Sequence, residues 1–210
     1  MTVLSKNRVK LTLKRNAPAI YFNGPSAPLQ VHRGIMFPIQ PDITYSQSVG
    51  YSPYDLTHTN YSYQAYRNTP SPDIQLTCQF ASVTDDEARY TYAVLHFLRS
   101  VSKMFFGVNQ TSPVAGTPPP VLNFSAFGQN QFNNVPVVVT QFSTTYDSNV
   151  DLKLFDGDTQ IPVMMNMFVG LAVQQNPDRQ KREFTTNDFI SGKAYQLSLI
   201  HISEPTRLLA

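Results

Sequence analysis

Apolar and polar residues alternate with a period of two along most of the chain, which is typical of antiparallel strands with one buried face. The clearest case is DIQLTCQFA, residues 73–81, which places on one side Ile74, Leu76, Cys78 and Phe80. The same alternation predicts strands over 41–51, 60–66, 121–128 and 160–174. A strand over 135–147 is apolar on both faces at its start, as expected for a strand covered on both sides, and a short strand is expected within 30–37. The prolines and glycines between these segments predict loops and turns.

One segment, residues 84–105, has the period of an amphipathic helix instead. Thr84 is a suitable N-cap, and Glu87 three residues later completes a capping box. The apolar positions recur at helical spacing and predict a face that packs against the core: Tyr90, Val94, Phe97, Leu98, Val101, Met104 and Phe105. Polar residues occupy the opposite side of the helix, among them Arg89, His96, Ser100 and Lys103.

Together these patterns predict a mainly β protein of the α+β class. An antiparallel β-sandwich or a partly closed barrel, covered by the single helix at about 84–105, would bury the apolar sheet faces. We expect residues 1–36 to form an N-terminal arm and loop. The segment RVKLTL within it alternates and is a candidate peripheral strand. Residues 37–196 form the main β domain in this interpretation.

Composition favours a protein that works in contact with partners. The 210-residue chain has a net charge of +2, and only 14% of its residues are charged, against roughly 25% in ordinary soluble domains. Interface cores are depleted in charge and enriched in tyrosine.

The longest apolar run, residues 161–173, is too short to span a bilayer and is interrupted by Pro162 and Gly170. Cys78 is the only cysteine. We therefore expect a soluble protein made in a reducing cytoplasm.

No arrangement of residues recommends an enzyme. The sequence has no phosphate loop, nucleophile elbow, HExxH or CxxC motif. The four histidines are scattered: His32, His58, His96 and His201. The acidic residues 85–87 are explained as charges that favour the start of a helix. We expect no catalytic residues, no metal site and no cofactor.

The last residues differ from the rest of the chain. LSLIHISEPTR, residues 197–207, matches residue by residue the translation of a transposase sequencing adapter. We therefore expect residues 197–210 to be foreign read-through, and the natural protein to continue past Gln196 with a different sequence.

Five stretches, taken in order, resemble a known family. They are FPIQPDITYSQSVGYSPYDL, NTPSPDIQLTCQFASVTDDEARYTYAVLHFLRSVSKMFFG, GTPPPVLNFSAFG, VPVVVTQFSTTYDSNVD and IPVMMNMFVGLAVQQNP. Over about residues 37–192 they resemble the baseplate tail-tube initiator, or tube-cap, proteins of contractile-tailed bacteriophages. They are similar, more distantly, to the tail-tube proteins of contractile injection systems. The resemblance lies in an order of strands, helix and proline-rich loop.

The resemblance implies a structural virion protein with a fold of tail-tube type. Copies would form a ring, a hexamer in the family, that joins the baseplate hub to the tail tube and templates tube assembly. Its partners would be copies of itself and the hub and tube proteins, with no membrane and with DNA only as passing cargo. The chain would be made in the host bacterial cytoplasm. The strongly apolar strands 135–142 and 161–173 supply candidate subunit-interface residues, namely Val137, Val139, Met165 and Phe168.

Two other functions stay open. A β-sandwich module could recognise carbohydrate or a host surface, with Tyr61, Tyr63 and Tyr66 stacking on the ligand. Alternatively, the basic N-terminal segment, with Lys6, Arg8, Lys10, Lys14 and Arg15, could bind nucleic acid. Self-assembly into rings would distinguish the tube-cap function from a carbohydrate- or host-binding module. A steep dependence on salt of the affinity for nucleic acid would indicate nucleic-acid binding.

The adapter match yields a prediction about the gene. Independent sequencing reads across the locus should diverge from this sequence near Gln196. Reads that continue through the codons for residues 197–207 into genomic sequence would contradict it.

Overall fold

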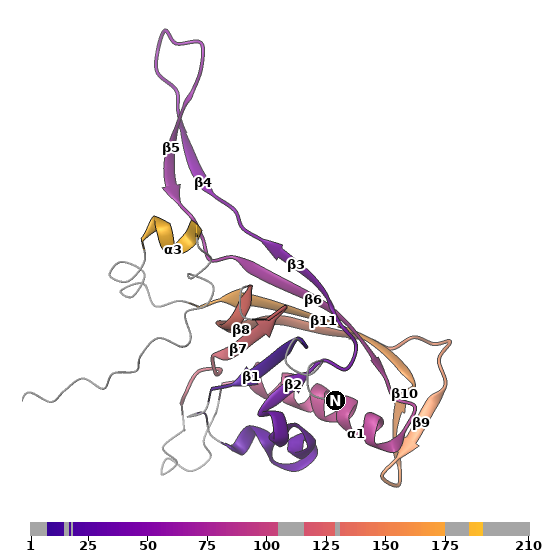
Figure 1. The fold of residues 1–210 in the computed structure, drawn as a ribbon. Helices are drawn as coiled ribbons and strands as arrows, with labels where there is room; N and C mark the ends of the chain where they lie inside the picture. The colour runs from indigo at the N-terminus through magenta and orange to yellow at the C-terminus, as the bar shows by residue number, and fades with distance from the viewer. Residues whose placement is uncertain are drawn as a thin grey trace, which may run out of the picture.

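A computed structural model describes residues 8–14, 17, 19–104, 116–128, 131–174 and 185–190 of the chain. Seven strands form one antiparallel sheet in the order β2-β1-β7-β8-β11-β6-β3 (Figure 1). Their bounds are β1 Lys10–Leu13, β2 Gly34–Met36, β3 Asp42–Ser46, β6 Asp73–Ala81, β7 Leu122–Ala126, β8 Phe132–Thr145 and β11 Met164–Val173. The expected mainly β protein with a large antiparallel sheet is confirmed.

The remaining elements are two separate ribbons and several helices. β4 (Gly50–Tyr54) pairs with β5 (Tyr63–Asn68), and β9 (Leu152–Phe155) pairs with β10 (Thr159–Pro162). The helices are the 3₁₀ segments η1 (Ala19–Phe22) and η2 (Gly24–His32), the long helix α1 (Asp85–Val101) and the short α3 (Thr186–Ile190). None of the described helices is long and apolar enough to cross a membrane.

Two described parts of the segment 1–36, residues 10–13 and 34–36, are strands of the sheet. β1 lies between β2 and β7 and pairs with both, and its residues Leu11 and Leu13 are buried. Gly34 allows β2 to lie this close to β1, because a side chain there would collide with the carbonyl oxygen of Leu11. The alternation in RVKLTL therefore marks an interior strand of the sheet, where a peripheral strand was expected.

The sheet is rolled rather than flat. Its edge strands β2 and β3 are consecutive in the chain and are joined by the five residues 37–41. Six strand spacings in a flat sheet would separate the edges by about 29 Å, whereas the step from Met36 to Asp42 spans at most about 21 Å. Phe37, next to one edge, also lies 6.1 Å from Phe80 on β6, measured between ring centroids. The sheet must therefore curl until its edges approach.

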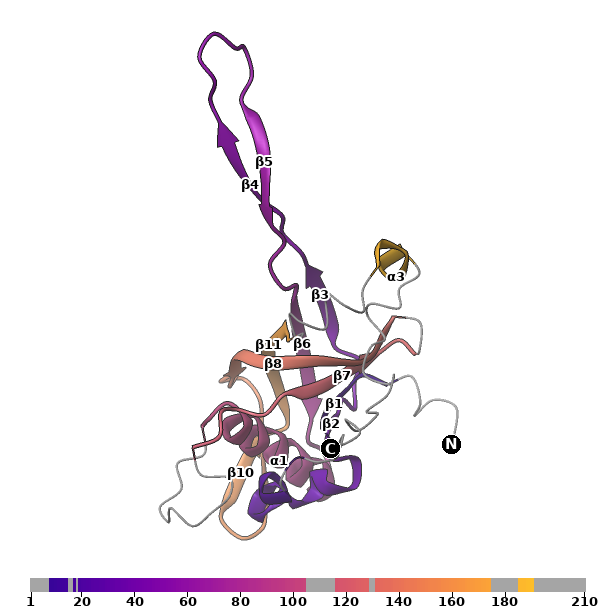
Figure 2. The ribbon, with the colours of Figure 1, turned by 90° about the vertical axis from the view of Figure 1, so that its left-hand side faces the viewer.

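Helix α1 lies with η1 and η2 on one side of the sheet (Figure 2). Its start has the expected capping box: Glu87 N–H donates to Thr84 Oγ1 at 3.3 Å, and Thr84 N–H donates to Glu87 Oε2 at 3.0 Å. Val94, Phe97, Leu98 and Val101 are buried, and Tyr90 is partly buried. The helix ends at Val101, not at 105. Met104 therefore lies past the helix and is 39% exposed, and Phe105 lies outside the described residues.

The hydroxyl of Tyr90 forms hydrogen bonds with both backbone polar groups of Met36 on the edge strand β2. It accepts a hydrogen bond from Met36 N–H at 2.9 Å and donates one to the Met36 carbonyl oxygen at 2.8 Å. Burial raises the pKa of the Tyr90 hydroxyl, which stays protonated and can make both bonds. A helix side chain thus replaces the neighbouring strand that Met36 lacks on this side.

Two sequence-based expectations about the backbone were wrong. Residues 19–29 were expected as loop and 30–32 as the start of a short strand, but 19–22 form η1 and 24–32 form η2, which contains Pro25 and Pro28. The expected strand 160–174 is divided at Val163, whose N–H donates to the Asp151 carbonyl while its own carbonyl accepts from Ser82 N–H. The proposed adapter segment 197–210 and most of the expected loop 108–120 lie outside the described residues.

The first stability prediction concerns Phe97, which is fully buried and stacks on Phe22 with 5.9 Å between ring centroids. Phe97→Ala should lower the free energy of unfolding by about 3–5 kcal/mol, because it leaves a cavity in the core. Ser100→Ala, on the exposed side of α1, is the control and should change little in the same denaturant titration. Equal, small effects would contradict this orientation of the helix.

The second prediction concerns the Tyr90 hydroxyl. Tyr90→Phe leaves both backbone groups of Met36 without their partner and should destabilise the fold by about 1–3 kcal/mol. Tyr92→Phe is the matched control, since the Tyr92 ring contacts Phe155 and His96 while no hydrogen bond of its hydroxyl is found among the described residues. Thermal unfolding that shifts equally in the two variants would show that the hydroxyl does not stabilise the edge.

Candidate interaction surface

The ribbon of β4 and β5 projects from the body of the molecule (Figure 2). It continues the line of β3 and β6 beyond the sheet and pairs with no other described strand. None of the residues from 47 to 71 is buried. An isolated two-stranded hairpin is marginally stable in water, and this ribbon therefore contributes little to the core.

Tyrosines dominate this ribbon, and they occupy both of its faces. Tyr51 lies opposite Tyr66, and Tyr54 lies opposite Tyr63. Because side chains alternate along a strand, the pair Tyr51–Tyr66 lies on one face and the pair Tyr54–Tyr63 on the other. The first pair makes an edge-to-face contact with 6.0 Å between ring centroids. All four side chains are 55% to 67% exposed, so both faces offer aromatic surface to a partner.

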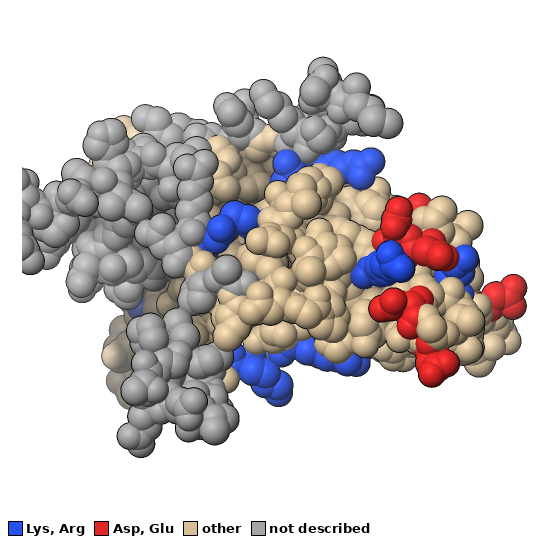
Figure 3. Space-filling view, turned by 90° about the horizontal axis from the view of Figure 1, so that it is seen from below, with Lys and Arg blue, Asp and Glu red and all other residues tan. Residues whose placement is uncertain are grey.

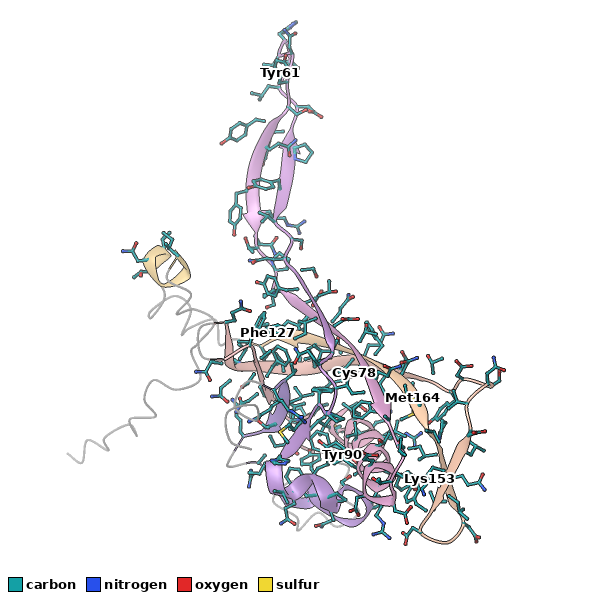
Figure 4. The ribbon with its side chains drawn as sticks, turned by 45° about the vertical axis from the view of Figure 1, so that its right-hand side comes forward. Tyr61, Cys78, Tyr90, Phe127, Lys153 and Met164 are labelled. Atoms are coloured by element: carbon teal, nitrogen blue, oxygen red, sulfur yellow. The ribbon has the colours of Figure 1, made fainter. Side chains whose placement is uncertain are left out.

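The loop at the ribbon tip is held by local polar contacts. Thr59 Oγ1 donates to the Leu56 carbonyl at 2.8 Å, and Ser62 Oγ donates to Asp55 Oδ1. Tyr61 lies at the tip (Figure 4) and is 89% exposed. The turn is therefore ordered by its own side chains and presents one further aromatic ring at its far end.

The candidate interface residues taken from the apolar strands do not form such a surface. Val137 and Met165 are buried inside the chain's own core, and Val139 packs against that core. β8 and β11 are apolar because they are central strands of the sheet, and this corrects the assignment of Val137 and Met165. Phe168 is only partly buried and lies between Thr77 and Ser143 on the polar face of the sheet.

The titratable side chains give no sign of a reactive centre in the described part of the chain. Burial raises the pKa of the Cys78 thiol to about 12, so the thiol stays protonated and unreactive at neutral pH. Burial, and secondarily the charge of Arg99, lower the pKa of His96, which keeps this ring neutral at pH 7. The described residues contain no cluster of His, Cys, Asp or Glu that could hold a metal ion.

Sequence reasoning noticed Tyr61, Tyr63 and Tyr66 only as stacking residues of an alternative binding module. The signal that could have identified the ribbon is the density of tyrosines over residues 51–66 on both parities of the alternation. A strand with one face in the core carries its large residues on one parity only. Tyr51 and Tyr54 differ in parity, and so do Tyr63 and Tyr66.

Comparison with known proteins adds no relative to this description. No protein-family model matches the chain, and no curated protein sequence matches it.

Proposed function

We propose that this protein is a structural subunit of a contractile phage tail, a ring-forming baseplate component that joins the hub to the tail tube. The proposal rests on the sequence resemblance and on one structural observation, the projecting ribbon β4–β5 with tyrosines on both faces. The partners would be copies of the same chain and the neighbouring hub and tube proteins.

The two-faced ribbon suits an assembly better than a free monomer. A ribbon that displayed tyrosines on one face could rest on a flat partner. With tyrosines on both faces, it fits between two surfaces, as it would where adjacent subunits meet. Tyrosine is enriched at protein interfaces because its ring is large, rigid and amphipathic.

The area involved is enough to matter for association. The ribbon and its tip carry five exposed tyrosines: Tyr51, Tyr54, Tyr61, Tyr63 and Tyr66. If each buried about 100 Å² more on assembly, the tyrosine surface removed from water would be roughly 500 Å². A standard interface buries about 800 Å² per partner. Divided between the two faces of the ribbon, this area is roughly 250 Å² per contact, or about a third of such an interface.

A carbohydrate- or host-binding module is the second candidate function, and the same ribbon is the observation that favours it. Exposed aromatic rings at the tip of a projecting hairpin could stack on sugar rings. This alternative requires neither self-association nor a hub.

The function is tested by co-expressing the chain with candidate hub and tube proteins, chosen from the genes that flank its own. Electron microscopy should show rings or short tubes with a central channel. Replacing Tyr51, Tyr54, Tyr63 and Tyr66 together by Ser should abolish these assemblies. The melting temperature should stay within about 2 °C, since exposed side chains contribute little to folding.

Tyr146→Ser is the matched control, because Tyr146 is a 54% exposed tyrosine outside the ribbon. It should leave assembly intact. A native chain that stays monomeric with these partners would overturn the proposal. Loss of glycan or host-cell binding in the ribbon variant, without any assembly by the native chain, would establish the alternative.

A further inference from the structure

The β9–β10 ribbon carries an apolar face that no other described part of the chain covers. Lys153 and Phe155 point toward α1: Lys153 Nζ lies 2.9 Å from Asp85 Oδ1, and the Phe155 ring contacts Tyr92. The alternate residues Leu152 and Leu154 therefore point away from the helix. Leu152 is 60% exposed and Leu154 is 53% exposed.

Acidic residues surround this leucine pair. The segments 85–87 and 147–158 together contain seven acidic residues and one lysine, and the Lys153–Asp85 ion pair joins the two segments in space. Figure 3 shows acidic side chains gathered at one end of the lower face, with basic side chains mostly elsewhere on it. The helix dipole explains the three acids at the start of α1. It does not explain the acids of the β9–β10 ribbon or the exposed leucines.

The opposite end of α1 is basic, and so its charge is complementary to that of the acidic surface. Arg99, Lys103 and Met104 are exposed there, and residues 99–104 contain no acid. The 17 residues of α1 separate the two ends by about 25 Å. The helix thus holds an acidic, leucine-bearing surface and a basic, methionine-bearing surface at opposite ends of the body.

We propose that these two surfaces bind each other between copies of the chain. Leu152, Leu154, Asp151 and Asp158 of one copy would contact Arg99, Lys103 and Met104 of the next. Such a contact joins two different surfaces of the same chain and can repeat, which produces a closed ring or an open filament. Opposite charges fix its direction, and the apolar side chains supply the buried centre. This inference rests on the proposed function, because it names a second contact between copies in the ring, separate from the tyrosine ribbon.

Charge exchange tests this contact in the full chain. Sedimentation over a concentration series should show reversible self-association at low salt that weakens at high salt, because added ions screen the pairs. The variants Asp151→Lys/Asp158→Lys and Arg99→Glu/Lys103→Glu should each remain monomeric. An equal mixture of the two should associate again, and so should one chain with all four substitutions, because opposite charges then face each other at every contact.

The leucines have their own test. Leu152→Ser/Leu154→Ser should weaken self-association at least tenfold while thermal unfolding shows an intact fold. Val31→Ser is the control, since Val31 is 82% exposed on η2 and belongs to neither surface.

Three results would overturn this inference: a native chain that stays monomeric at low salt, charge-exchanged variants that associate as the native chain does, or a folded four-substitution chain that does not associate. The proposed function fails separately, if no rings form with the hub and tube proteins. Rings built by charge-exchanged variants would disprove this contact alone.

Discussion

The short connection between β2 and β3 is the constraint on which the rest of the fold depends. These strands form opposite edges of a seven-stranded sheet, yet only residues 37–41 separate them in the chain. The sheet can satisfy this only by rolling up, which brings Phe37 against Phe80 on β6. The rolled sheet buries one face against α1 and the 3₁₀ helices. Its other face carries polar residues of β6 such as Gln75, Thr77 and Gln79.

The same geometry explains why part of the chain lies outside the core. The segments 42–54 and 63–81 run side by side as one long hairpin, of which β3 and β6 belong to the sheet. β4 and β5 pair with no other described strand and carry no buried residue, so this half of the hairpin continues into solvent without a covering layer. α1 stabilises the body at the other edge, where Tyr90 binds Met36, and it separates the acidic from the basic end. One hairpin and one helix thus position every exposed feature that we assign to assembly.

Much of this fold is predictable from the sequence, because alternation reports burial directly. The pattern over 73–81 predicted β6 with both of its bounds, since its residues are alternately exposed and buried. The pattern failed at Val163, which continues the alternation although the backbone changes partners there. η2 escaped detection because its prolines are typical of loops and it has no apolar period. The interaction surface was harder to predict. The apolar content of their strands suggested Val137 and Met165 as interface residues, but both are buried within the chain's own core, which explains why they are apolar. For β4 and β5 the only local signal is that large residues occupy both parities of the alternation, as Tyr51 and Tyr54 do, and alternation by itself does not say whether a strand lies inside the sheet.

The position of β1 has a consequence for synthesis of the chain. β1 pairs with β2 soon after both are made, but its second neighbour β7 begins at Leu122, more than one hundred residues later. At ribosomal rates of about 5–20 residues per second, β1 waits roughly 5–20 s for this partner. During that time Val9, Leu11 and Leu13 have no completed sheet to enter, and the nascent chain exposes an unpaired apolar strand edge. Charged side chains on a strand edge oppose pairing with another chain, and Arg8, Lys10 and Lys14 place such charges along β1 and close to its ends.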